Sequence, residues 1–276
     1  MKAVLTGSGG QLAAAMRATV PEDVQVTWLA RADLDVTDAA AVSRHPALNG
    51  CDVLINTAAY TAVDAAEDDV DAATAVNELA PGYLAQRCAG EGAHLVHLST
   101  DYVFGPDAPH RPLTPQDATA PDTVYGRTKL AGEHRLRDLD ATVLRTAWVY
   151  SGNTLPGHRD FVSTMLRLEQ THPELTVVDD QHGCPTYAVD LARAVWQAAR
   201  ERSGGIRHAV GAGQTTWFGL ARAVFTEIGA DPERIRPVTS AEYPTAARRP
   251  EWSVLASDYE LPEWRSALSR AVAAKL

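Results

Sequence analysis

Short apolar segments alternate with segments of helical periodicity along the first 150 residues. The apolar segments are KAVLT (2–6), VQVTWLA (24–30), DVLINTA (52–58), AHLVHLST (93–100) and ATVLRTAWVY (141–150). Helical spacing occurs at 10–18, 38–48, 67–90 and 124–138. The apolar segments are nearly continuous rather than alternating, which is typical of strands covered by helices on both faces. The alternation of strand and helix predicts an α/β fold of the Rossmann type, with a doubly wound parallel sheet.

The pattern is less regular after about residue 150. Loops rich in Gly, Pro and polar residues occupy 151–159 and 179–187, and the remaining predicted elements are a helix (187–201), a strand (205–211) and two helices (216–229 and 262–274). We expect an NAD(P)-binding Rossmann domain over 1–150, to which about 187–211 also contribute. We expect a smaller C-terminal substrate-binding lobe over 151–276, interleaved with it.

Composition narrows the classes of function. The formal net charge of −10 disfavours nucleic acid as a partner, because phosphate backbones require a basic surface. Three cysteines without C-x-x-C spacing indicate a reducing, cytoplasmic setting without disulfides. The sequence has no apolar segment of the roughly 18 residues that a membrane span needs, and no H-E-x-x-H motif. We therefore expect neither a membrane protein nor a catalytic metal site.

The segment TGSGGQLA (6–13) follows the first predicted strand and begins a helix. Gly7, Gly10 and Ala13 have the spacing of a dinucleotide-binding turn, in which small residues allow a tight turn, close approach of a pyrophosphate and packing of helix on strand. The first N–H groups of the helix would face the phosphates. Its place in a strand–helix–strand unit favours a dinucleotide site over a plain structural turn.

The segment RADLDVTD (31–38) follows the second predicted strand. An Arg at this point pairs with the 2′-phosphate of NADP, whereas an acidic residue bonds the ribose of NAD. Arg31 therefore favours NADPH, and Asp33 and Asp35 leave NADH possible. The alternative is a solvated loop arginine.

A tyrosine and a lysine lie one helical turn apart in VYGRTKLAGEH (124–134), so Tyr125 and Lys129 share a face. An ammonium group near a phenol lowers the pKa of the phenol from about 10 toward the pH at which proton transfer is effective. The segment LSTDYVFG (98–105) ends the fourth predicted strand, and Thr100 offers a hydroxyl that could hold a substrate carbonyl. Ser99 or Asp101 could be the functional group instead, or all three could form a cap or a turn.

Seven segments in order resemble the extended short-chain dehydrogenase/reductases, and within them the dTDP-4-dehydrorhamnose reductases. They are GSGGQLA (7–13), INTAAYTAVDAAE (55–67), STDYVF (99–104), YGRTK (125–129), RTAWVY (145–150), DQHGCPT (180–186) and YPTAARRP (243–250). The resemblance implies an NAD(P)H-dependent oxidoreductase that reduces the C4 keto group of dTDP-4-dehydro-6-deoxy-L-mannose to give dTDP-L-rhamnose. The implied cofactor is NADPH, with NADH possible.

The resemblance also implies roles for individual residues. Tyr125 protonates the developing alkoxide, Thr100 orients the carbonyl, and Lys129 lowers the pKa of Tyr125 and binds ribose. The cofactor-binding residues are Gly7, Gly10, Gln11, Leu12, Arg31, Asp35, Ala58, Ala59, Tyr60, Ser99, Tyr125 and Lys129. The substrate-binding residues are Thr61, Val63, Asp101, Trp148, Gln181, Pro185, Thr186 and Arg249, with Arg248 as the rival of Arg249 at the diphosphate. Asn77 is placed for a proton relay or for plain helix packing.

Two departures from the family pattern affect the expectations. Asp160 stands where many relatives have Asn, and an anion there would repel a diphosphate, which leaves its role open. Some relatives bridge a dimer through glutamates and magnesium, but this chain has LAAAM (12–16) and Val189 at those places. We therefore expect no metal site and no metal-bridged dimer.

Three alternatives stay open or are disfavoured. Sugar 4,6-dehydratases carry Thr-Asp-Glu where this chain has Thr100-Asp101-Tyr102, so dehydration is disfavoured. A reductase of another nucleotide-linked 4-keto-deoxysugar, including one that forms a streptose-type sugar, stays open. A non-catalytic regulatory subunit of the same fold has no need for the Tyr125, Lys129 and Thr100 set. The sequence does not distinguish the sugar, the epimer formed or the oligomeric state.

Overall fold

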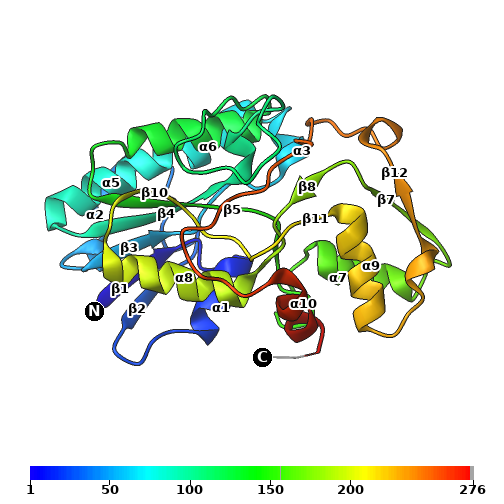
Figure 1. Ribbon diagram of the computed structural model, residues 1–276. Coiled ribbons are helices and arrows are strands. Elements are labelled where there is room, and N and C mark those ends of the chain that lie inside the picture. The colour runs from blue at the N-terminus through cyan, green and yellow to red at the C-terminus, as the bar shows by residue number, and fades with distance from the viewer. Residues whose placement is uncertain (156, 274–276) are drawn as a thin grey trace.

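A computed structural model describes residues 1–155 and 157–273 (Figure 1). Its centre is a six-stranded parallel sheet, and the strands lie side by side in the order β10-β5-β4-β3-β1-β2. The strands are β1 (Lys2–Thr6), β2 (Gln25–Leu29), β3 (Val53–Asn56), β4 (His94–Thr100), β5 (Ala141–Thr146) and β10 (Gly205–His208). The strand order changes direction at β1, since β2 lies on one side of it and β3 on the other. The predicted doubly wound parallel sheet is confirmed.

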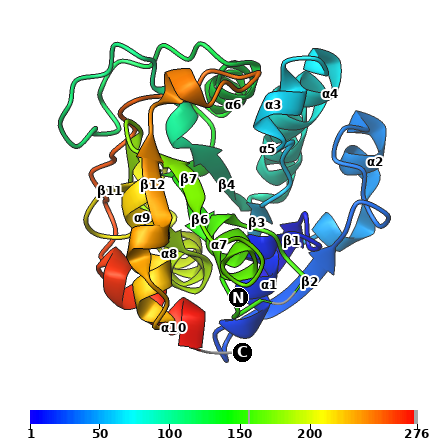
Figure 2. The ribbon, with the colours of Figure 1, turned by 90° about the vertical axis from the view of Figure 1, so that its right-hand side faces the viewer.

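Helices cover both faces of this sheet (Figure 2). One face is covered by α1 (Gln11–Ala18) and α8 (Ala188–Glu201), and the other by α2 (Ala39–Arg44), α5 (Ala80–Glu91) and α6 (Val124–Arg135). The central strands are apolar because their side chains are buried under both layers. The apolar cluster under α1 and α8 continues into the C-terminal part of the chain, so the two parts share one core.

Two expected helices are shorter than the sequence pattern suggested. The first, over 38–48, ends at Arg44, and Pro46 begins a separate 3₁₀ turn, η1 (Pro46–Leu48). The second, over 67–90, is divided into α4 (Val70–Thr74), a π-helical turn η2 (Ala75–Leu79) and α5, with α3 (Val63–Ala66) just before it. The π-helical turn packs closely on α6, because a Cβ on Gly132 would lie 2.1 Å from the Asn77 carbonyl oxygen.

The expected strand 141–150 is also divided. It ends at Thr146, a short strand β6 (Val149–Tyr150) follows, and between them Trp148 has a left-handed backbone with φ of 47°. That conformation is costly for a residue with a side chain, by about 1–3 kcal/mol. It directs the chain out of the main sheet and into the second part of the fold.

The second part holds short paired strands and three helices, at the right of Figure 1. Its helices are α7 (Phe161–Glu169), α9 (Trp217–Glu227) and α10 (Trp264–Ala273), and its strands are β7 (Leu175–Val178), β8 (His182–Gly183), β9 (Thr186–Tyr187), β11 (Thr215–Thr216) and β12 (Ile235–Val238). Among the described residues, the 3₁₀ turns η4 (Pro232–Arg234) and η5 (Ser240–Glu242) also belong to this part, whereas η3 (Asp101–Val103) directly follows β4 of the main sheet. The pattern of apolar residues predicted α9 and α10 but not α7, β7 or β12. The last position of the expected helix 262–274 lies outside the described residues.

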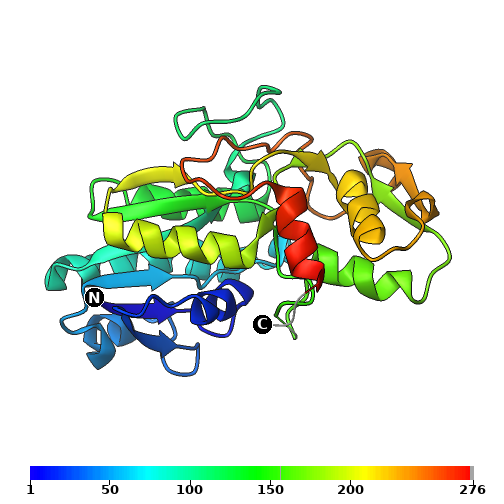
Figure 3. The same cartoon turned by 60° about the horizontal axis from the view of Figure 1, so that its bottom comes forward.

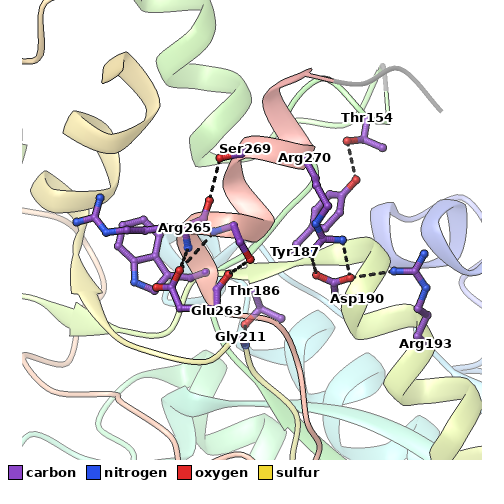
Figure 4. Close-up of polar contacts among 12 residues, drawn as sticks. Thr154, Thr186, Tyr187, Asp190, Arg193, Gly211, Glu263, Arg265, Ser269 and Arg270 are labelled. Carbon is purple, nitrogen blue, oxygen red and sulfur yellow. Dashed lines mark hydrogen bonds and ion pairs between the residues drawn. The ribbon is translucent and has the colours of Figure 1, made fainter. Parts of the chain in front are cut away.

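The C-terminal helix α10 lies between α8 and α7 (Figure 3). Asp190 of α8 is buried and accepts hydrogen bonds from Arg270 of α10, at 3.0 and 2.5 Å, and from Arg193 at 2.9 Å (Figure 4). Beside them the hydroxyls of Thr154 and Tyr187 are 2.9 Å apart. These contacts attach the end of the chain to the helix that covers the main sheet.

The structure also bears on the expectations about disulfides, membrane spans and metal sites. Cys51, Cys88 and Cys184 are all buried free thiols. Across residues 1–155 and 157–273, no helix is both long and apolar enough to span a bilayer. The same residues contain no group of three or more His, Cys, Asp or Glu side chains arranged to hold a metal ion.

Candidate active site

A cavity of about 870 Å³ opens at the carboxyl ends of β1, β3, β4 and β5. Open α/β sheets bind ligands at this edge, where the strand order changes direction. The cavity brings together most of the residues that the sequence singled out. They are Gly7, Gly10, Gln11, Leu12, Arg31, Asp35, Ala58, Ala59, Tyr60, Thr61, Val63, Ser99, Thr100, Asp101, Tyr125, Lys129 and Trp148.

The glycine turn forms one wall of the cavity. Gly7 has φ of 79°, and a Cβ there would lie 2.5 Å from the Ala58 amide nitrogen, so only glycine lets the turn lie against the end of β3. Gly10 is the N-cap of α1 and no side chain caps the helix. The first N–H groups of α1 therefore stay available to an anion, which fits the pyrophosphate of a dinucleotide.

Arg31 stands where β2 ends, and its side chain is 86% exposed. Its guanidinium lies 3.6 Å from the Asp35 carboxylate. Thr37 donates to that carboxylate from its hydroxyl at 2.7 Å and its amide at 3.0 Å, and these bonds lower the pKa of Asp35. Arg31 is thus an exposed cation at the cavity rim.

Tyr125 and Thr100 lie together on the cavity wall. Thr123 caps the start of α6 by accepting from the Gly126 amide at 3.0 Å, which fixes the first helical turn. Thr100 accepts from the Tyr102 amide at 3.2 Å and donates to Asp101 Oδ1 at 3.0 Å. The Tyr102 ring packs edge-on against Tyr125, with centroids 5.5 Å apart. The Thr100 side chain lies close enough to the Tyr125 phenol to lower its pKa by hydrogen bonding.

The expected effect of Lys129 on Tyr125 depends on where the Lys129 amine lies. The Lys129 amine contacts the Leu98 carbonyl at 2.6 Å and His97 Nε2 at 3.3 Å rather than the phenol. Burial raises the pKa of Tyr125 to about 12, and the neighbouring Thr100 side chain opposes this. Burial also lowers the pKa of Lys129 to about 8. Burial is thus the largest influence on the pKa of Tyr125 in this arrangement, and the lowering of that pKa by Lys129 stays a prediction.

A buried ion pair lies beneath these groups. Glu133 of α6 accepts from Arg145 of β5, at 3.0 Å from Nε and 2.7 Å from Nη2, and from the Ser99 hydroxyl of β4 at 2.5 Å. The Arg145 and Glu133 side chains are 2% and 1% exposed. Although Ser99 lines the cavity, its hydroxyl is already engaged with Glu133. The pair joins α6, the helix that carries Tyr125, to β5, and the Ser99 bond joins the same carboxylate to β4, the strand that carries Thr100.

Asp101 is a second buried carboxyl group on the wall. It is 2% exposed, and its Oδ2 has no hydrogen-bond partner within the part of the chain that the structure describes. Burial raises the pKa of Asp101 to about 6, although Ser253 and Thr100 oppose the shift. The group therefore stands close to its titration range at neutral pH.

Aromatic rings close the far end of the cavity. Trp148 stacks on Trp217 of α9 with centroids 3.6 Å apart and planes 6° apart, and Phe161 packs on the other side of the pair at 4.7 Å. Trp217 also lines the cavity, together with Arg159 and His158. Sequence analysis missed these three residues, because no motif links the N-terminus of α9 or the loop before α7 to the sheet.

Four expected substrate residues lie outside the cavity lining. The Thr186 hydroxyl donates to the Cys184 carbonyl at 3.1 Å and accepts from the Gly211 amide at 3.1 Å, and its contact with the sugar stays a prediction. Gln181 donates to Ser240 at 2.8 Å, and Pro185 is buried beside Thr186. Arg249 pairs with Asp64 at 2.6 Å. Contact of Gln181, Pro185 and Arg249 with a ligand stays a prediction.

Two residues with open roles have clear structural contacts. Asn77 accepts from the Tyr60 amide at 2.9 Å and donates to the Tyr60 carbonyl at 3.1 Å, so it positions the chain that follows β3. Asp160 caps α7 and accepts from Gln11 at 2.8 Å and from the Ser151 and Gly152 amides. The Asp160 carboxylate is therefore engaged by groups of the protein itself, and its effect on a diphosphate stays open.

Comparison with known proteins agrees with this geometry. The chain matches the family model described as the RmlD substrate binding domain over residues 1–276. It is 46% identical over 285 residues to the dTDP-4-dehydrorhamnose reductase of Mycobacterium tuberculosis (strain CDC 1551 / Oshkosh), covering 98% of this chain and 92% of that protein. It is 39% identical over 272 residues to a dTDP-4-keto-6-deoxy-D-glucose reductase of Streptomyces niveus, covering 96% and 90%.

Solved structures are similar over the same extent. A dTDP-4-dehydrorhamnose reductase from Clostridium acetobutylicum superposes with a TM-score of 0.90 at 36% identity, covering 98% of this chain and 97% of that one. The Bacillus anthracis dTDP-4-dehydrorhamnose reductase in complex with NADP gives a TM-score of 0.90 at 30% identity, covering 97% and 96%. With the Tyr125, Lys129 and Thr100 set at the sheet edge and a match from end to end, this chain belongs to the RmlD family of dTDP-4-dehydrorhamnose reductases.

Proposed function

We propose that this protein reduces the C4 keto group of dTDP-4-dehydro-6-deoxy-L-mannose to give dTDP-L-rhamnose, with NADPH as the reductant. The observation that carries the proposal is the placement of the Tyr125 phenol beside the Thr100 hydroxyl on the wall of the cavity that the glycine turn opens. NADPH supplies a hydride when it is bound. The remaining chemistry is performed by side chains of this chain.

Tyr125 is the proton donor for the substrate oxygen. Its pKa of about 12 keeps it protonated at neutral pH, so the proton is present when the carbonyl oxygen gains charge. Thr100 orients the same oxygen by hydrogen bonding. The apolar faces of Trp148 and Val63 form walls that exclude water from the sugar, and Thr61 lines the cavity beside them.

The residues that would hold NADPH fit its chemical parts. The uncapped start of α1 and the glycine turn suit the pyrophosphate, and Arg31 suits the 2′-phosphate. Ala58, Ala59 and Tyr60 follow β3 along the cavity wall, and Lys129 is the donor for a ribose hydroxyl. The exposed guanidinium beside Asp35 is the reason to prefer NADPH while NADH stays possible.

The test is replacement of Tyr125 by Phe, which removes the proton donor and keeps the ring. We expect kcat to fall by about 10²–10⁴-fold, as is typical when an acid–base group is removed. NADPH affinity should change little. The control is Tyr243→Phe, because Tyr243 is exposed and outside the cavity. A Tyr125→Phe protein with activity like that of the control would rule out the proposed role.

A second candidate is reduction of a related dTDP-4-keto-6-deoxysugar. The 39% identity to the Streptomyces niveus dTDP-4-keto-6-deoxy-D-glucose reductase over 96% of this chain favours it. The two functions share the proton donor and the cofactor and differ in the sugar that the cavity accepts. Parallel assays with the L-mannose and D-glucose forms of the ketosugar separate them, since the preferred substrate has the higher kcat/KM.

Further expectations concern location and assembly. Three buried free thiols suit the reducing cytoplasm. The opening helix carries Leu12, Ala13 and Met16 where some relatives have a magnesium ligand, so we propose that any dimer forms without a bridging metal. Size measurement by light scattering with and without a chelator tests this, and a chelator-dependent dimer would contradict it.

A further inference from the structure

A row of buried polar side chains crosses the sheet beneath the cavity and ends at Lys129. Thr6, Asn56 and His97 are register partners on β1, β3 and β4. Their side chains are hydrogen-bonded in sequence, from Thr6 to Asn56 at 2.8 Å and from Asn56 to His97 at 3.0 Å. His97 Nε2 then lies 3.3 Å from the Lys129 amine. All four residues are at most 2% exposed.

The direction of each hydrogen bond in this row is fixed by one backbone group. The Ala58 amide donates to Asn56 Oδ1 at 3.1 Å, and a backbone N–H can only donate. This assigns the oxygen of the Asn56 amide to the side that faces Ala58 and Thr6. The other side is therefore the NH₂ group, which donates to His97 Nδ1.

The neutral ring of His97 carries one N–H proton, on either Nδ1 or Nε2. Its Nδ1 is an acceptor, so in the neutral ring the proton is on Nε2. Burial and the neighbouring Lys129 hold the pKa of His97 well below its ordinary value, which keeps the ring neutral. The Nε2–H group points to the Lys129 nitrogen, and that nitrogen can accept a hydrogen bond only as an uncharged amine.

We propose that His97 is a positioning residue for Lys129: held by Asn56 with its proton on Nε2, it donates to the Lys129 nitrogen and favours the uncharged amine in the protein alone. Lys129 in turn donates to the Leu98 carbonyl at 2.6 Å, which fixes the amine at the base of the cavity. This inference rests on the proposed function in one respect, because the proposed function makes Lys129 part of the active site.

The other charged groups near Lys129 do not provide a competing partner for the amine. Glu133, one turn along α6, favours the charged form, but its carboxylate is engaged by Arg145 and Ser99. Asp101 of η3 hydrogen-bonds Thr100 and acts on Tyr125. Glu78 of the π-helical turn pairs with Arg135 further along α6. Burial lowers the pKa of Lys129 to about 8, in the same direction as the hydrogen-bond pattern.

The consequence is that Tyr125 is uncharged at neutral pH, whereas Lys129 loses its proton near pH 8, well below the range of an ordinary lysine. When Tyr125 gives its proton to the substrate oxygen, a phenolate forms, and an ammonium at Lys129 would stabilise it. Because His97 Nε2–H opposes that ammonium, its tautomer sets how readily Lys129 takes up a proton. Sequence analysis assigned no role to His97 and interpreted it as part of an apolar strand.

The composition of the chain makes the test direct, because Lys2, Lys129 and Lys275 are its only lysines. The full-length protein labelled with ¹³C at lysine Cε gives three NMR signals, and loss of one in Lys129→Arg assigns Lys129. In the wild-type protein, Lys129 should titrate well below the other two lysines. Nitrogen-15 spectra of labelled histidine, with His97 assigned by its loss in His97→Gln, should show the His97 proton on Nε2.

Two substitutions should raise the proton affinity of Lys129. His97→Gln replaces the N–H donor with an amide that can turn its oxygen to an ammonium. Asn56→Asp keeps the acceptor for Ala58 and turns the other atom into an acceptor, which moves the His97 proton to Nδ1. In each case, we expect the Lys129 titration midpoint to rise by about one pH unit or more. His94→Gln is the control, because His94 lies on the same strand but contacts Asp140 and Thr142.

The outcomes separate this role from simple packing. A packing role alone would change the unfolding temperature of the variants and leave the Lys129 titration at its wild-type midpoint. The proposal is overturned if His97 carries its proton on Nδ1 in the wild type. It is also overturned if Lys129 titrates together with Lys2, or if both variants leave it unchanged. None of these spectra depends on turnover, so the proposed reductase could fail while this inference stands.

Discussion

Replacing Glu133 by Ala tests whether the buried ion pair holds the active-site helix to the sheet. The substitution leaves the Arg145 guanidinium 2% exposed without its carboxylate, and it leaves the Ser99 hydroxyl without its acceptor. Arg145 has no spare partner to recruit, since its Nη1 already lacks a hydrogen bond among the described residues. The perturbation therefore isolates an unpaired buried charge.

The expected cost follows from that burial. Removing one partner of a buried pair typically destabilises a protein by about 3–5 kcal/mol, because the remaining charge stays desolvated. That is a large fraction of the about 5–15 kcal/mol by which a domain is stable. A comparison pair joins Arg135, on the same helix as Glu133, to Glu78 of η2, with side chains 44% and 26% exposed. Glu78→Ala should cost only about 0–1 kcal/mol, since that pair is screened by water.

Urea unfolding followed by circular dichroism measures both variants against the wild type. If Glu133→Ala does not fold, Glu133→Gln keeps an acceptor for Ser99 and should still unfold at lower urea than Glu78→Ala. Because Glu133 joins α6 to β5 through Arg145 and to β4 through Ser99, we also expect the Glu133 variants to lose activity more than stability alone requires at low temperature. Equal unfolding midpoints for the Glu133 and Glu78 variants would refute the reasoning.

Two further predictions follow from groups at the cavity. The pKa of Asp101 is raised to about 6 in the folded protein from an ordinary value of 3.8, so its stabilising contribution is complete below pH 3.8 and is lost as the pH rises through 6. Asp101→Asn should therefore gain about 2–3 kcal/mol relative to the wild type between pH 4 and pH 7 in urea unfolding, and a pH-independent difference would contradict this. Arg31→Ala should raise the KM for NADPH by about tenfold or more, with little change in the KM for NADH, because a phosphate contact to an arginine is charge-assisted. Steady-state assays with the two cofactors measure this, and equal changes in the two KM values would contradict a role of Arg31 at the 2′-phosphate.

The local sequence pattern was sufficient to predict the central sheet and most residues of the cavity wall. The buried strands and the turn at Gly7 are encoded within a few residues, so periodicity and glycine spacing identify them. Trp217 could not be found in this way, because it meets Trp148 only after the C-terminal part that carries α9 has folded beside the sheet. The breaks at Trp148 and in η2 were missed for a related reason, since tertiary contacts with Gly183 and Gly132 impose them.

Electrostatic roles were predicted less well than positions. The sequence placed Lys129 one turn from Tyr125, and the structure confirms that spacing on α6. It could not show that the amine faces His97, because the partner comes from β4 and depends on the register of three strands. Asp160 was difficult for the same reason, as its donors come from α1 and from the loop after β6.

The most direct test of the account is turnover of dTDP-4-dehydro-6-deoxy-L-mannose, generated in situ, with NADPH and identification of the sugar formed. The account predicts NADPH oxidation that depends on the ketosugar, with dTDP-L-rhamnose as the product. NADPH binding without oxidation, or formation of a different epimer, would contradict it.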